Sequence, residues 1–116
     1  MPRRKNDSPF PGSNTLLVLA MLEDADKYGY QIIRELECRS DQTFSMNEGT
    51  LYPILHGLEK GKYLSGYQQQ APSGRMRKYY RLTRKGRELL AEKKAEWASF
   101  HRGVADVLSG GANALA

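Results

Sequence analysis

Reactive and metal-binding residues are scarce in this sequence. It has one cysteine, Cys38, and two histidines, His56 and His101, which lie far apart along the chain. A disulfide framework or a thiolate metal site needs at least a second cysteine, and the glycine-rich motif of a phosphate-binding loop is missing. We therefore expect no cofactor, no metal ion and no enzymatic activity.

Long apolar runs are missing as well. No stretch approaches the roughly 18 apolar residues of a membrane-spanning helix, and the N-terminus shows no signal peptide. A single cysteine suits a reducing compartment. The sequence therefore predicts a cytoplasmic protein without a membrane partner. Its 116 residues suffice for one domain that folds without metal or disulfide.

Acidic residues are in the minority, 13 against 18 lysines and arginines. The imbalance is local, because residues 72–102 contain ten of the basic residues and only three of the acidic ones. A concentrated positive field favours a polyanion, and nucleic acid is the commonest polyanion in cells.

The segment 47–61, NEGTLYPILHGLEKG, predicts a short helix with two different faces. Its apolar residues recur at helical spacing and form one buried stripe, made of Leu51, Ile54, Leu55 and Leu58. The opposite arc is small, polar or aromatic and holds Gly49, Thr50, Tyr52, Pro53, His56, Gly57 and Lys60. A solvated face would gain nothing from glycine and proline, which lower helix propensity. A face that presents hydrogen-bonding groups at close approach suits the DNA major groove.

The ends of this helix carry their own signals. Asn47 is the best N-cap, and Ser45 with Glu48 would form an alternative capping box. Pro53 removes one backbone hydrogen bond, so we expect a kink or early fraying there. Gly61 is expected to close the helix at the C′ position.

Two helices are predicted before this segment. Residues 16–22 are almost wholly apolar and follow Ser13 and Asn14, either of which can cap a helix. This first helix would be buried on more than one side, by its own core and by a partner chain. A charged turn over 23–27 leads to a second helix that ends near residues 40–42 and whose inner face is Ile32, Ile33 and Leu36. Residues 1–12 predict a disordered basic arm, either solvated or in contact with phosphates.

A β-hairpin is predicted after the third helix. A strand begins near Tyr63, a turn with proline and glycine covers 71–77, and a strand returns over 78–82. Because the hairpin tip is basic and three helices precede it, residues 13–83 predict a winged helix-turn-helix domain. The fold class is thus mainly α with a two-stranded β wing.

The last helix is predicted over 84–108, with Thr83 as its N-cap, and residues 109–116 form a frayed tail. About 25 residues extend roughly 37 Å, which is longer than three short helices can cover. A second copy of the chain is the simplest surface for its apolar seam, and a monomer that folds the helix back is the alternative. The expected dimer interface is Leu16, Leu19, Leu90, Trp97, Phe100, Val104, Val107 and Leu108.

Four blocks together resemble the PadR family of winged-helix transcriptional regulators, in its short branch with one C-terminal helix. They are KYGYQIIREL, MNEGTLYPILHGLEKGKYL, SGRMRKYYRLTRKG and the helix that contains Trp97, and they cover about residues 14–108. The resemblance implies a homodimer held by the first and last helices on an inverted-repeat operator. It also implies a repressor that a small molecule relieves.

The expected site residues follow from both arguments. DNA-binding residues are Asn47, Thr50, Tyr52, His56, Lys60, Arg75, Arg77 and Lys78. Of these, Thr50, Tyr52 and the hairpin residues follow the family motif, and Asn47 and Lys60 are expected to anchor the backbone. An effector site for a planar aromatic molecule would use Trp97 and Phe100, although Trp97 can instead simply fill the dimer core. Lys93, Lys94 and His101 lie within a turn of Trp97 and disfavour a cationic ligand.

Two other functions suit a winged helix. A protein-interaction module would show an apolar patch on the third helix in place of His56, Lys60 and a basic wing. An RNA-binding module would present aromatic stacking platforms for single-stranded bases, and the hairpin tip SGRMR has none. Double-stranded DNA is therefore the partner that the sequence favours.

Overall fold

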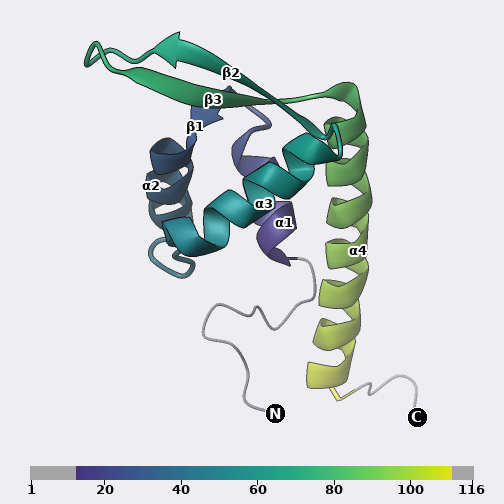
Figure 1. Ribbon diagram of the computed structural model, residues 1–116. Coiled ribbons are helices and arrows are strands. Elements are labelled where there is room, and N and C mark those ends of the chain that lie inside the picture. Colours follow the sequence, from purple (N-terminus) through teal and green to yellow (C-terminus); the bar gives the residue numbers. More distant parts are fainter. Residues whose placement is uncertain (1–12, 111–116) are drawn as a thin grey trace.

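The computed structural model describes residues 13–110, and the arm 1–12 and residues 111–116 of the tail lie outside it. The described chain is mainly helical with a small antiparallel sheet, which confirms the expected fold class (Figure 1). Its elements in order are α1 (Ser13–Met21), β1 (Lys27–Tyr28), α2 (Gly29–Arg39), α3 (Glu48–Lys60), β2 (Leu64–Gln70), β3 (Met76–Leu82) and α4 (Arg84–Leu108).

Helix α1 lies at the centre of the fold and packs against α2, α3 and α4. Its burial on several sides therefore comes from this chain itself. Leu19 is 0% exposed and Leu90, in the first half of α4, is 2% exposed, and both belong to the main hydrophobic cluster. The expectation that Leu19 and Leu90 contact a second copy of the chain is wrong, because both side chains are already buried within this chain. Leu16 is only partly buried.

Helix α3 begins as the sequence predicts, but the left-handed residue that follows its C-terminus lies one position later than expected. The Oδ1 atom of Asn47 accepts a hydrogen bond from the Thr50 amide at 2.9 Å, so Asn47 is the N-cap. The helix continues through Pro53. Because proline has no amide hydrogen, the carbonyl of Gly49, four residues earlier, lacks its donor within the helix. Gly49 is exposed in the first turn, so water can donate to this carbonyl instead. Lys62, with φ +68°, takes the left-handed position that was expected of Gly61. The amide of Tyr63 donates to the Leu58 carbonyl at 2.8 Å, which completes a Schellman motif.

The sheet has three strands in the order β1-β3-β2, and β1 was not predicted. The wing itself is the expected hairpin of β2 and β3, although β3 begins at Met76, two residues before the expected start. The bond from the Ala71 amide to the Arg75 carbonyl, 2.8 Å long, closes the turn.

A buried lysine explains the position of β1. Lys27 is 3% exposed, and its Nζ atom donates to the carbonyl of Met21 and, at 2.8 Å, to Oδ1 of Asp24. The ammonium group thus satisfies a carbonyl at the C-terminus of α1, where cations are favourable. A lysine at a buried strand position gives no hydrophobic signal, so the sequence pattern indicated only a charged turn.

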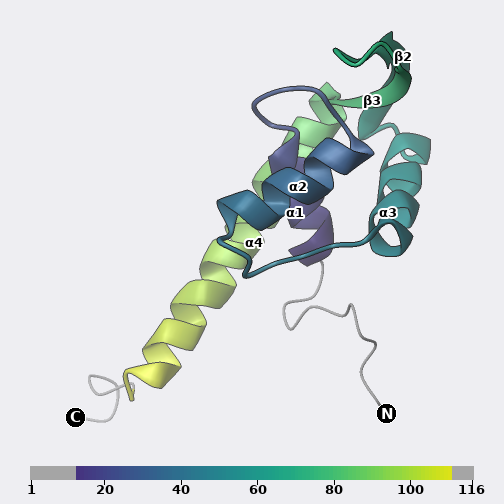
Figure 2. The ribbon, with the colours of Figure 1, turned by 90° about the vertical axis from the view of Figure 1, so that its left-hand side faces the viewer.

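Helix α4 has two halves with different surroundings. Its first half lies along α1, whereas its second half extends away from the other helices (Figure 2). Beyond Leu90 its apolar side chains are exposed, and they are Trp97, Phe100, Val104, Val107 and Leu108. Within the described residues, no helix is both long enough and apolar enough to cross a membrane.

Candidate nucleic-acid interface

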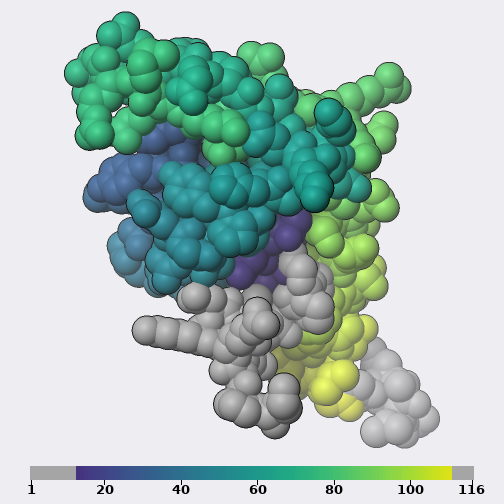
Figure 3. All heavy atoms as spheres, viewed as in Figure 1, coloured from purple at the N-terminus to yellow at the C-terminus, as the bar shows by residue number. Residues whose placement is uncertain are grey.

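The outer face of α3 and the wing form one continuous surface (Figure 3). On this surface His56, Gly57 and Lys60 are exposed, and Thr50 is partly buried. A Cβ atom built on Gly57 would meet no other atom within 4 Å. The helix backbone at Gly57 is therefore bare, and a partner surface can approach it closely.

Tyr52 does not stand free on this face. Its ring is partly buried and points toward the start of α2, where a Cβ atom on Gly29 would lie 2.5 Å from its hydroxyl oxygen. Gly29 thus makes room for this hydroxyl group. The rings of Tyr52 and His56 lie 6.1 Å apart and are tilted by 40°.

The three basic residues expected at the wing have three different surroundings. Arg75 is exposed in the turn, and no described residue forms an ion pair with it. Lys78 donates from Nζ to Oε1 of Glu59 at 2.8 Å, and this hydrogen bond raises the pKa of Lys78 above its ordinary value. Because Glu59 belongs to α3, the pair ties the wing to that helix. Lys78 is therefore a weaker candidate for phosphate binding than the sequence suggested.

Arg77 has the most unusual position of the three. Its guanidinium carbon lies 4.9 Å from the centroid of the Tyr28 ring, within the range of cation–π contacts. Its Nε atom is buried and has no hydrogen-bond partner among the described residues. A buried guanidinium nitrogen without an acceptor is costly, and no hydrogen bond from the described residues offsets that cost for Arg77.

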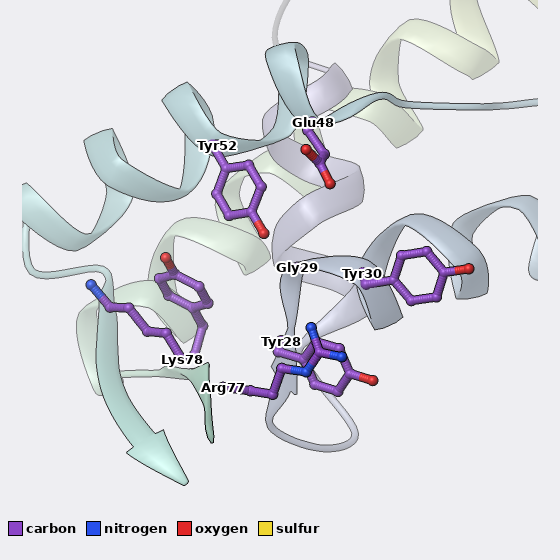
Figure 4. Close-up of a pocket in the computed structure, with 8 residues that line it drawn as sticks. Tyr28, Gly29, Tyr30, Glu48, Tyr52, Arg77 and Lys78 are labelled. Carbon is purple, nitrogen blue, oxygen red and sulfur yellow. The ribbon is translucent and has the colours of Figure 1, made fainter. Parts of the chain in front are cut away.

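A hollow of about 270 Å³ separates the start of α2, α3 and β3, and Arg77 lies at its edge (Figure 4). Sequence reasoning missed five of the residues that line it, which are Tyr28, Gly29, Tyr30, Glu48 and Tyr80. For Tyr30 the block KYGYQIIREL contained a usable signal, because Tyr30 and Arg34 are spaced i,i+4 and can therefore contact each other on one face of a helix. In the structure Nη1 of Arg34 donates to the Tyr30 hydroxyl at 3.2 Å, and this bond raises the pKa of Arg34.

A second polar cluster fixes the sheet. The Tyr67 hydroxyl donates to Oδ2 of Asp26 at 2.6 Å, and Nε of Arg81 donates to the same oxygen at 3.2 Å. The hydrogen bond to Asp26 raises the pKa of Tyr67. The Tyr67 ring also stacks on Tyr79 with centroids 5.9 Å apart. These contacts hold β2 and β3 against the loop before β1, so the wing has a defined direction.

The exposed half of α4 offers a different kind of surface. Phe100, Val104, Val107 and Leu108 help to line an apolar hollow of about 450 Å³. Trp97 is 45% exposed, and its ring stacks on His101 with centroids 4.9 Å apart and planes 10° apart. Lys94, which was expected near this ring, instead pairs with Glu23 at 3.0 Å. The described residues include no group of histidine, cysteine or acidic side chains placed to bind a metal ion.

Comparisons with known proteins agree on one family. Residues 18–92 match the model of the transcriptional regulator PadR-like family. An uncharacterized protein, protein X, of Lysinibacillus sphaericus is 37% identical over 82 residues, which are 71% of this chain and 75% of that protein. The crystal structure of smu.1704 from Streptococcus mutans is 37% identical with a TM-score of 0.76, and the match covers 89% of this chain and 95% of that one. A PadR-like transcriptional regulator from Bacillus cereus is 30% identical with a TM-score of 0.74, covering 84% and 92% of the two chains.

Proposed function

Since this chain belongs to the PadR-like family of transcriptional regulators, it is a DNA-binding transcriptional regulator and not an enzyme, and we propose that it acts as a homodimeric repressor on an inverted-repeat operator. The observation that carries the proposal is the outer face of α3. It combines a bare backbone at Gly57 with the exposed side chains of His56 and Lys60, and a wing lies beside it.

Sequence readout is assigned to α3. Thr50 and His56 reach base edges in the major groove, and Lys60 contacts the DNA backbone. Asn47 holds the first turn of α3 in place as its N-cap. Arg75 contacts phosphates from the wing turn. A good bidentate base contact discriminates by about 1–3 kcal/mol, so His56→Ala should relax the preference at one or two operator positions.

Selection of bound duplexes from a random pool tests this assignment and yields the operator. Wild-type protein should enrich an inverted repeat, and the His56→Ala protein a motif that is degenerate at a few positions. Binding to RNA with equal or higher affinity would support the RNA-binding alternative. Enrichment of no duplex at all would refute the proposed function.

The dimer is assigned to the exposed half of α4, with Leu16 of α1 beside it. The apolar side chains from Trp97 to Leu108 lie along about three turns of helix and are exposed. Burial of such a surface against its own copy gives a two-fold interface. In a two-fold dimer the two α3 helices would enter successive major grooves about 34 Å apart.

Light scattering during gel filtration measures the mass of the dimer. Val104→Glu places a charge on this surface and should give monomers. Arg102→Glu, on the opposite side of α4, is the matched control and should leave the dimer intact. A wild-type protein that stays monomeric at micromolar concentration would exclude the assignment.

Relief of repression is assigned to a planar aromatic molecule that stacks on Trp97 near the two-fold axis. A stacked aromatic ring contributes about 0.5–1.5 kcal/mol beyond its buried area. Phe100 lies one turn away on the same face and would bound the site. Lys94 pairs with Glu23, so its positive charge is neutralised. Only Lys93 and His101 therefore remain to disfavour a cationic ligand at Trp97.

The Trp97→Ala variant separates this site from a plain dimer core. Loss of core packing should destabilise the dimer by about 3–5 kcal/mol. Loss of a pocket wall should abolish dye binding in a protein that is still dimeric. Trp97 is the only tryptophan, so quenching of its fluorescence by planar aromatics reports the site directly. A titration with planar aromatics that leaves the Trp97 fluorescence unchanged would refute the effector site.

A further inference from the structure

The loop after α1, residues 23–27, contacts elements that are far apart in the sequence, and we infer that it couples the dimerisation helix α4 to the wing. A movement of α4 at the dimer interface then changes how the wing lies on DNA, with Asp26 as the residue that positions the wing. This inference rests on the proposed function, because it concerns how the dimer helix regulates DNA binding.

The first residue of the loop contacts α4. Nζ of Lys94 donates to both carboxylate oxygens of Glu23, at 3.0 and 3.1 Å, although the two residues are 71 positions apart. Leu90, one turn earlier in α4, is buried, whereas Trp97, three residues after Lys94, is 45% exposed. The ion pair therefore lies where α4 leaves the core, and a movement of the exposed half of this helix acts directly on Glu23.

Asp26 contacts the wing from the other end of the loop. Its Oδ2 atom accepts from the Tyr67 hydroxyl in β2 at 2.6 Å and from Nε of Arg81 in β3 at 3.2 Å. The guanidinium carbon of Arg81 also lies 5.1 Å from the centroid of the Tyr67 ring. One carboxylate thus holds both strands of the hairpin. A displacement of Asp26 therefore moves the two strands together.

The middle of the loop connects these two contacts rigidly. Lys27 is 3% exposed, and its Nζ atom donates to the Met21 carbonyl and, at 2.8 Å, to Oδ1 of Asp24. These bonds fold the loop onto the end of α1. Few torsions remain free between Glu23 and Asp26, so a displacement at one of them is passed to the other instead of being absorbed.

Exposure limits the strength of the coupling. The side chains of Glu23 and Lys94 are each about half exposed, and exposed ion pairs change an equilibrium by roughly 1.5- to 5-fold. Contacts of this strength adjust DNA affinity and do not abolish it. Salt screens such pairs, so the measurements below are best made at low ionic strength.

NMR of the protein alone tests the coupling without DNA. Lys94→Met removes the contact at α4 and should shift the amide signals of Tyr67 and Arg81 in the wing. Lys93→Met is the matched control, because it removes the same charge from the neighbouring position, which has no ion pair among the described residues. Its wing signals should stay close to those of wild type.

Duplex affinity tests whether the coupling reaches DNA. Loss of an acidic side chain reduces repulsion of DNA and by electrostatics alone strengthens binding, as Glu92→Ala on the outer side of α4 should show. Asp26→Ala and Glu23→Ala should instead each weaken operator binding roughly 1.5- to 5-fold. The double variant should bind no more weakly than Asp26→Ala, because both changes break one connection.

Tyr67→Phe guards against a change that is merely destabilising. It keeps every charge and removes one hydroxyl group from the Asp26 contact, so it should also weaken operator binding. Thermal unfolding of each variant shows that affinity is measured on folded protein. A loss of affinity that follows the loss of stability across Asp26→Ala, Tyr67→Phe and Glu23→Ala would assign these residues a structural role only and overturn the coupling.

Three further results would overturn it. The first is a set of wing signals that respond equally to Lys94→Met and Lys93→Met. The second is an Asp26→Ala protein that binds its operator as well as or better than wild type. The third is additive effects of Glu23→Ala and Asp26→Ala on affinity. Failure of wild-type protein to bind any duplex would refute the proposed function, whereas wild-type binding with additive variants would refute the coupling alone.

Discussion

Replacement of Gly57 by alanine should change stability and DNA binding in opposite directions. Gly57 lies in the interior of the 13-residue helix α3, is exposed and has an ordinary helical φ, because the positive values among glycines belong to Gly74 and Gly110. A Cβ atom there would meet nothing within 4 Å. The folded protein alone therefore gives no reason for glycine at this position.

Alanine is about 0.8–1.0 kcal/mol more favourable than glycine inside a helix. For a domain of this size a gain of 1 kcal/mol raises the melting temperature by about 4–8 °C. If α3 enters a major groove with this face, the added methyl group meets the DNA. Overpacking costs about 1–3 kcal/mol, which weakens binding roughly 5- to 140-fold.

Thermal unfolding and fluorescence anisotropy with a labelled operator measure the two effects on the same samples. Gly57→Ser is a useful companion, because it adds a similar volume with a much smaller gain in helix propensity. A Gly57→Ala protein that is more stable and binds its operator with wild-type affinity would show that this face of α3 stays in solvent. The assignment of α3 as the reading helix would then have to be abandoned.

Other predictions follow from the ionic contacts. Lys78→Met should leave the salt slope of DNA binding almost unchanged, because Glu59 already neutralises this lysine, and a loss near 0.9 per protomer would contradict that reasoning. Lys27→Met should lower the free energy of unfolding in urea by about 1–3 kcal/mol, since the Met21 carbonyl loses a buried donor; an unchanged midpoint would mean that water replaces it. Bonds to Lys27 and Arg39 lower the pKa of Asp24 from its ordinary 3.8 to about 2, so its contribution to stability is present above pH 3.8 and is lost as the pH falls toward 2. Asp24→Asn should make the melting temperature less sensitive to pH in that range, and an equally steep dependence in the variant would assign the effect to other carboxylates.

Local signals in the sequence were enough to predict the four helices and the β-hairpin. Asn47 and Thr83 cap their helices as predicted, because a cap involves residues only three positions apart. Helix α4 has the predicted bounds, Arg84–Leu108. The C-terminus of α3 differed because the left-handed residue is Lys62, and a lysine carries no sequence signal for that conformation.

Contacts between distant segments could not be predicted in the same way. The sequence showed that α1 has more apolar surface than one neighbour covers, but it did not show which element supplies the cover. Helix α4 packs against α1, and Leu19 and Leu90 are both buried in the main hydrophobic cluster, so neither belongs to the expected dimer interface. Similarly, Asp26 and Arg81 are 55 positions apart, and no periodicity connects them.

The surroundings of the wing cations show why residue type alone does not define a binding site. Arg75, Arg77 and Lys78 carry the same charge within four positions of one another, yet one is exposed, one is stacked on Tyr28 and one is paired with Glu59. Strand geometry separates the last two, because successive side chains point to opposite faces of a sheet. Their electrostatic effect on DNA therefore depends on where α2 and α3 place Tyr28 and Glu59. A basic hairpin in a sequence predicts attraction to a polyanion, but the packing of the helices decides which of its cations can bind one.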